Sequence, residues 1–245
     1  MTMLSNRPVR QLAVAAATVA ALAASLTACD SNEPTEKPTT EAVSSNLCGA
    51  QLSTGARRAL LYVLGSKKFT TDEPTAALGR TARSLVSGYQ QKGPDDSATA
   101  EEYQLCTAYA PAADFGVELS FYLSKTVPAP TPLLPKFTQY EMGELALSRP
   151  LNAFLYMKCS SGSFSSDGDS VLIRGELTNP LAVNSNDDTL RERNMNVLHA
   201  VSLAMVKELG CKGDAGLPAR FSARSSVQPP SGRAPSPAPP RTPPS

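Results

Sequence analysis

The sequence contains no tryptophan and only one histidine, His199, in 245 residues. A single histidine excludes a metal site built from several histidines. A Ser-His-Asp site would have to use His199, yet the chain has neither a GxSxG turn nor an SxxK motif. The lack of tryptophan disfavours a carbohydrate-stacking cleft, although two acids could still meet in space as a glycosidase pair. We therefore predict no catalytic residues and no metal ligands.

The sequence also lacks a large excess of charge of either sign, since its 23 basic and 22 acidic residues leave a net charge of +1. Without a basic field there is no electrostatic argument for a nucleic-acid partner. No GxGxxG or GxxxxGK motif occurs, so nothing indicates a nucleotide cofactor. The acidic stretch 30–46 and the basic stretch after Cys211 are typical of solvated tails. We expect no nucleic-acid partner and no cofactor.

Residues 1–28 have the layout of an export signal. Arg7 and Arg10 precede an uncharged, alanine-rich run from Leu12 to Ala28. A permanent membrane helix would need about 20 strongly apolar residues, whereas this run is rich in alanine, threonine and serine. The two arginines are not adjacent, so the twin-arginine export route is not indicated. The sequence therefore predicts a cleaved signal peptide.

Cys29 follows this run, and it could be half of a disulfide, an unpaired thiol or a lipid attachment point. Residues 26–29, "LTAC", match the lipobox pattern, so the chain start resembles a bacterial lipoprotein signal. The resemblance implies a diacylglycerol on the Cys29 sulfur and cleavage between Ala28 and Cys29. Two acyl chains, at about 0.8 kcal/mol per buried methylene, give stable anchoring. We expect a lipid-anchored protein on the extracytoplasmic face of the cell membrane.

Both ends of the mature chain have an amino-acid composition that is typical of segments without a folded structure. The segment 29–46 is polar and rich in Glu, Thr, Ser and Pro, which predicts a disordered linker. The segment 222–245 is proline-rich and predicts a disordered tail with a polyproline-II bias. Such a tail is more typical of a wall-spanning or glycosylated spacer than of a ligand for an aromatic groove. The remaining segment, 47–221, has the length of one domain.

Helical periodicity appears near both ends of this domain. A short amphipathic helix is predicted within 51–65, and a second within 70–89 with Thr71 or Asp72 as its N-cap. A longer apolar stripe over 189–209 predicts a third helix that ends at Gly210, with two aspartates at its start. His199 lies opposite that stripe, so we expect it to be exposed or beside a second contact surface.

The middle of the domain changes to a period of two, which is typical of strands. The candidate strands are 103–110, 117–124, 139–148, 153–160 and 170–178. The proline-rich stretch 126–136 predicts a loop, and Asp167-Gly168 predicts a hairpin turn. Helices at the ends and strands in the middle indicate an α+β fold with an antiparallel sheet of about four to five strands.

The four remaining cysteines, Cys48, Cys106, Cys159 and Cys211, form an even set in an exported chain, which favours two disulfides over buried thiols. None of them forms a CxxC pair, which disfavours a zinc ribbon or a redox site. Four cysteines allow three connectivities. We favour Cys48 with Cys106 and Cys159 with Cys211, because each bond would then join a helix end to the sheet.

The lipobox, the Ala-, Arg- and Pro-rich composition, the four cysteines and the phrases "LYMKC", "IRGELT" and "VSLAMVKELGC" together resemble small secreted actinobacterial lipoproteins of unknown function. This resemblance implies a surface location and no particular reaction. We therefore expect a non-enzymatic module that binds a protein or a small-molecule ligand. The alternatives are a transporter-associated solute-binding protein and, third, an extracytoplasmic hydrolase that uses His199.

Overall fold

The computed structural model describes residues 45–73, 75–97, 100–129, 137–164, 169–182 and 187–223. The predicted signal peptide with Ala28 and Cys29, nearly all of the linker and of the tail, and the Asp167-Gly168 turn lie outside the described residues. The predictions made for them stay predictions.

A seven-stranded antiparallel sheet forms the centre of the domain, in the order β3-β4-β5-β9-β8-β7-β6. Its strands are β3 (Thr70–Thr71), β4 (Tyr103–Tyr109), β5 (Gly116–Ser124), β6 (Thr138–Tyr140), β7 (Leu145–Ser148), β8 (Asn152–Ser160) and β9 (Ser170–Thr178). A separate two-stranded ribbon pairs β1 (Asn46–Leu47) with β2 (Ala50–Gln51).

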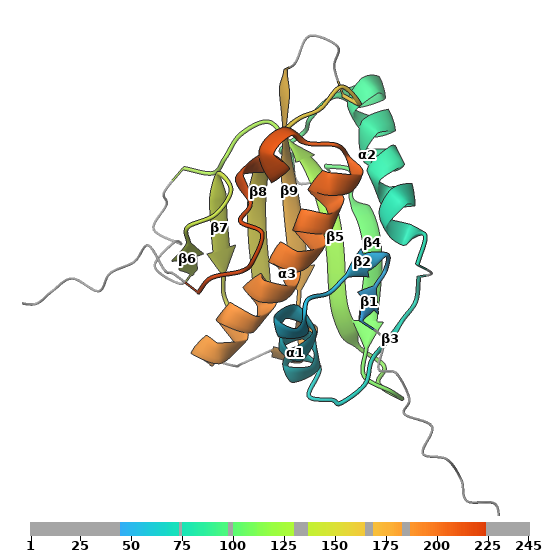
Figure 1. Cartoon of the computed structure of the whole chain (residues 1–245), viewed down its shortest axis with the longest axis vertical. Coiled ribbons are helices and arrows are strands. Elements are labelled where there is room, and N and C mark those ends of the chain that lie inside the picture. Colours follow the sequence, from blue (N-terminus) through green and yellow to red (C-terminus); the bar gives the residue numbers. More distant parts are fainter. Residues whose placement is uncertain are drawn as a thin grey trace, which may run out of the picture. The chain divides into compact units, whose positions relative to one another are not determined.

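The three α-helices of the described residues lie on one side of this sheet, and in Figure 1 two of them stand in front of it and the third at its right-hand edge. The α-helices are α1 (Thr54–Val63), α2 (Ala77–Lys92), which is the one at the edge, and α3 (Asp188–Glu208). Two short 3-10 helices, η2 (Pro180–Ala182) and η3 (Lys212–Gly216), lie before and after α3 in the chain. The predicted α+β class is confirmed. No helix in the described ranges is long and apolar enough to span a membrane.

The core lies between the helices and the sheet face that they cover. Alternate residues of neighbouring strands meet on that face, such as Phe121 opposite Gly175 and Met157 opposite Ile173. Gly175 lets α3 approach closely, because an added Cβ would lie 2.9 Å from the Ser202 Oγ. A larger residue at this position would push α3 away from β9.

The opposite face of the sheet carries polar and aromatic side chains. The Arg174 guanidinium lies 4.0 Å from the centre of the Tyr122 ring and 3.6 Å from the Glu176 carboxylate. Burial raises the pKa of Tyr122 to about 12, and it also raises the pKa of the Glu176 carboxyl. The arginine therefore has both a π face and a carboxylate as partners on this side of the sheet.

Cys48 and Cys106 form the first predicted disulfide, with their Cα atoms 6.2 Å apart. Cys48 and Gly49 are the two turn residues between β1 and β2, and both have positive φ, of 56° and 101°. The Cys48 carbonyl accepts the Leu78 N–H at 3.0 Å, in the first turn of α2. The disulfide thus links the β1–β2 hairpin, whose turn binds the first turn of α2, to strand β4.

Cys159 and Cys211 form the second predicted disulfide, with a Cα separation of 4.9 Å. Cys211 follows the end of α3, where Gly210 has a φ of 68°. The Gly210 N–H donates to the Lys207 carbonyl and the Cys211 N–H to the Val206 carbonyl, which is a Schellman motif. The predicted stop at Gly210 is confirmed, and the disulfide holds this helix end on β8.

Two details of the sequence prediction were wrong. Neither Thr71 nor Asp72 is the N-cap of α2, since Thr71 belongs to β3 and the Asp72 carboxylate accepts the Thr107 N–H at 2.7 Å. The helix begins later, after Ala76. The candidate strand 139–148 is in fact two strands, β6 and β7, separated by a turn in which Gly143 has a φ of 56°. This split and the short β3 raise the number of strands.

Candidate functional site

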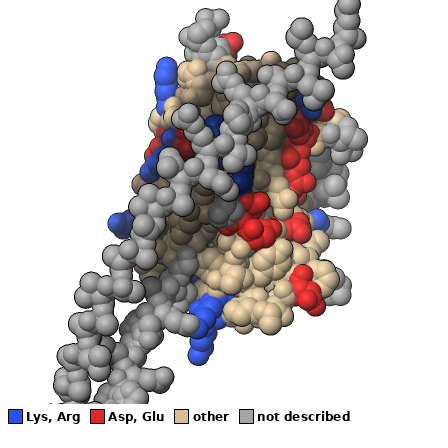
Figure 2. Space-filling view, turned by 90° about the vertical axis from the view of Figure 1, so that its right-hand side faces the viewer, with Lys and Arg blue, Asp and Glu red and all other residues tan. Residues whose placement is uncertain are grey.

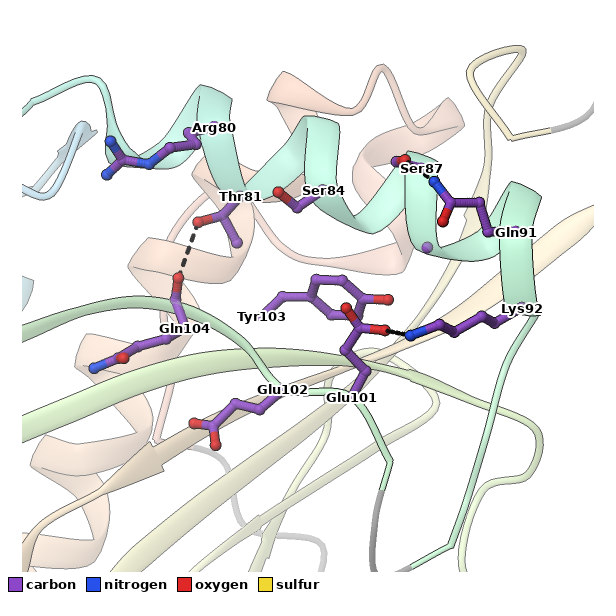
Figure 3. A pocket seen from close by; sticks show the side chains of 11 residues that line it. Arg80, Thr81, Ser84, Ser87, Gln91, Lys92, Glu101, Glu102, Tyr103 and Gln104 are labelled. Carbon is purple, nitrogen blue, oxygen red and sulfur yellow. Dashed lines mark hydrogen bonds and ion pairs between the residues drawn. The ribbon is translucent and has the colours of Figure 1, made fainter.

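Several surface hollows of the described residues bring polar side chains together, and two of them are compared as candidate sites. The first, of about 390 Å³, lies between α2 and the start of β4. In Figure 3 the Tyr103 ring points from β4 toward α2, and its hydroxyl lies against Gly88. An added Cβ at Gly88 would fall 1.8 Å from that hydroxyl oxygen. Glycine is therefore required at this crossing for steric reasons.

The charged groups around this first hollow already have partners within the protein, including Glu102, whose carboxylate accepts from the Ser120 hydroxyl. The Lys92 ammonium lies 2.6 Å from the Glu101 carboxylate, and Arg80 pairs with Glu73. The Thr81 hydroxyl donates to the Gln104 carbonyl at 3.2 Å, as Figure 3 shows. Burial raises the pKa of Tyr103, so its phenol stays protonated at neutral pH. These internal partners leave the α2–β4 hollow little capacity to bind a ligand.

The second hollow is larger, about 550 Å³, and we call it the His199 hollow. Three parts of the chain form it: the residues that start α1, the middle of α3 and the segment 219–221 after η3. Leu203, Ala200 and Phe221 provide apolar surface, while Ser53, Asn196 and Arg220 provide polar groups. A few polar groups in a partly apolar concavity are typical of small-molecule sites, and the volume lies in their usual range.

His199 is buried in the wall of this hollow, with 2% of its surface exposed. The expectation of a solvent-exposed histidine was therefore wrong, whereas a second contact surface beside it exists. The Phe221 ring centre lies 6.0 Å from the imidazole, and the Pro218 carbonyl oxygen lies 2.9 Å from Nε2. Burial lowers the pKa of His199, with the Pro218 hydrogen bond opposing the shift.

The tautomer of His199 follows from its partner. A carbonyl oxygen can only accept a hydrogen bond, so Nε2 must carry the proton that it donates to Pro218. In the neutral ring, Nδ1 is then left as an acceptor. In the described part of the chain, Nδ1 forms no hydrogen bond. The hollow therefore contains a neutral imidazole that can accept one hydrogen bond.

Charge is mixed on the surface as well. Figure 2 shows Asp and Glu side chains in the middle and at the right of the face beside α2, with Lys and Arg side chains spread around them. Among the described residues there is no group of three or more His, Cys, Asp or Glu side chains that could hold a metal ion.

A scan against protein-family models found no match for this chain, and searches among curated proteins and among solved structures found none either. We therefore infer the function from the residues themselves.

The sequence predicted one part of this site and missed another. The four cysteines predicted to pair do pair, and they stabilise the domain without lining the His199 hollow. Arg220 and Phe221 were not predicted as site residues, because they follow a turn just before the proline-rich tail and show no periodicity. Only the fold brings them to Gly55, which is more than 160 residues away in the chain.

Proposed function

We propose that this chain is a membrane-anchored extracytoplasmic lipoprotein, held through lipid on Cys29, whose domain binds a small-molecule ligand without catalysing a reaction on it. The observation that carries the binding role is the His199 hollow, a concavity with apolar and polar walls and a buried imidazole that has one unused acceptor. The two disulfides support an oxidising, extracytoplasmic location for this domain.

The two alternatives have less support. Solute-binding proteins of transporters usually close two α/β lobes over their ligand, whereas the described residues form one large antiparallel sheet, with helices on one face, and a small two-stranded ribbon. A hydrolase would need His199 beside a nucleophile, but its hydrogen-bond partner in the described segments is the Pro218 backbone carbonyl. We therefore prefer a binding module.

The binding role can be tested by nuclear magnetic resonance on the exported chain labelled with ¹⁵N, screened against a library of small fragments of varied charge. We expect amide shifts that cluster at Gly55, Asn196 and Leu203. The matched control is the α2–β4 hollow, where Ser84 and Gln91 should not shift. A library with no hit at the His199 hollow would contradict the proposed function.

A further inference from the structure

The His199 hollow contains the N-terminal end of α1, a helix of ten residues. Ser53 is its N-cap, and its Oγ accepts the Ala56 N–H at 3.2 Å. The N–H groups of Thr54 and Gly55 precede the first intrahelical hydrogen bond, so the helix provides no partner for them. Both residues line the hollow. The hollow is therefore lined by two residues whose backbone donors the helix does not use, at the positive end of the helix dipole.

The side chains around these donors favour an anion. The exposed Arg220 lines the same hollow, and none of the residues lining it is acidic. The amide nitrogen of Asn196 lies 4.0 Å from where a Cβ on Gly55 would be. Since that Cβ would meet nothing closer than 3.8 Å, packing does not require glycine at this position. Because Gly55 has no side chain, nothing from this residue covers the Thr54 and Gly55 N–H groups on the side where Asn196 lies.

The other residues that line the hollow would be complementary to two further features of a ligand. His199 lines the hollow, and because Nε2 donates to Pro218, the Nδ1 of its neutral ring is left as an acceptor that suits an N–H or O–H donor on the ligand. Leu203 and Phe221 favour an apolar group. A carboxylate, an adjacent N–H and an apolar side chain occur together at the C-terminal residue of a peptide.

We infer that the His199 hollow binds an N-acylated apolar amino acid, the group that also ends a peptide, with its carboxylate at the α1 N-terminus and Arg220, its N–H at the His199 Nδ1, and its side chain against Leu203 and Phe221. This inference rests on the proposed binding function, and it names the ligand class for the same hollow. The carboxylate is the part of the ligand that the site distinguishes most strongly, because charge-assisted hydrogen bonds are stronger than neutral ones.

The test compares two probes of nearly the same shape, N-acetyl-L-phenylalanine and N-acetyl-L-phenylalaninamide, in titrations of the ¹⁵N-labelled exported chain. We expect the carboxylate to shift the Thr54 and Gly55 amides and to bind about tenfold more tightly than the amide. Added salt should weaken the carboxylate and leave the amide unchanged. Arg220→Gln should remove most of the difference between the two probes.

Arg83→Gln is the matched control, since it removes a cation from α2, away from the His199 hollow, and should leave both affinities unchanged. Arg220 is exposed, so its variant is expected to fold with an unchanged urea midpoint. Equal affinity for the two probes, or an equal loss from both arginine variants, would overturn the ligand class while leaving the binding role intact. A failure of both probes would also overturn it, and the fragment screen would then decide the proposed function separately.

Discussion

Removing the Cys48–Cys106 disulfide tests how this small domain is stabilised. The two cysteines are 58 residues apart in the chain. Closing a loop of that length lowers the entropy of the unfolded chain by an amount worth about 4 kcal/mol at 25 °C. Typical domains have a total stability of about 5–15 kcal/mol. We therefore expect the variant with Cys48→Ala and Cys106→Ala to lose a large part of its stability.

The backbone at Cys48 makes this prediction sharper. A φ of 56° is unfavourable for most residues other than glycine and is tolerated best by asparagine and aspartate. The cysteine is thus strained by about 1 kcal/mol, and alanine would keep that strain. A second variant with Cys48→Gly and Cys106→Ala should be more stable than the double-alanine variant by about that amount, because glycine relieves the strain and adds no polar group at this buried position.

Both variants are measured by urea unfolding of the oxidised chain, with Cys29→Ser in every background so that no unpaired thiol or lipid interferes. The second disulfide supplies the comparison, since its cysteines are 52 residues apart. Removing it should cost nearly the same, within about 0.1 kcal/mol from loop length alone. A loss below about 1 kcal/mol for Cys48–Cys106, or no gain from glycine at position 48, would refute the reasoning.

Three further predictions concern packing, pH and anchoring. Gly88→Ala should destabilise the domain by about 2 kcal/mol through the clash with Tyr103, whereas Gly162→Ala, with no atom within 4 Å of its new Cβ, should be nearly neutral in urea unfolding; equal effects would contradict this. Because folding lowers the pKa of His199 below the ordinary value of 6.5, the unfolded chain takes up the proton first as the pH falls. Stability should therefore decrease below about pH 6.5, and His199→Gln should flatten that part of the profile measured by unfolding at several pH values. Cys29→Ser should release the protein from the membrane fraction and remove acyl groups from its intact mass; an unchanged membrane fraction would disprove the lipid anchor.

Elements defined by local pattern could be predicted from the sequence. The apolar stripe and Gly210 fixed the end of α3, and Asp187 indeed caps its start by accepting the Thr189 N–H at 2.8 Å. The disulfide pairs could be favoured because each cysteine lay beside a predicted helix end or in a predicted strand. These signals are short in range, so the rest of the fold hardly affects them.

Features that depend on distant segments could not be predicted. His199 lies on the polar side of α3, and nothing in the helix pattern shows that residues 217–221 return to cover it. Asp72 has the composition of an N-cap, but β4 offers it the Thr107 N–H instead. In both cases a partner far away in the sequence determines the environment, and local propensity carries no information about such a partner.

The order of the disulfides along the chain has a consequence for biogenesis. Cys48 pairs with Cys106 and Cys159 with Cys211. Each disulfide therefore joins two of these four cysteines that are consecutive along the chain, and the two loops that the disulfides close do not overlap. If Cys29 is acylated as proposed, these are also the pairs that would reach the outside of the membrane together during export. An oxidase that joins thiols in their order of emergence would then form the native bonds directly. Maturation should therefore need an oxidant and no enzyme that rearranges wrong disulfides.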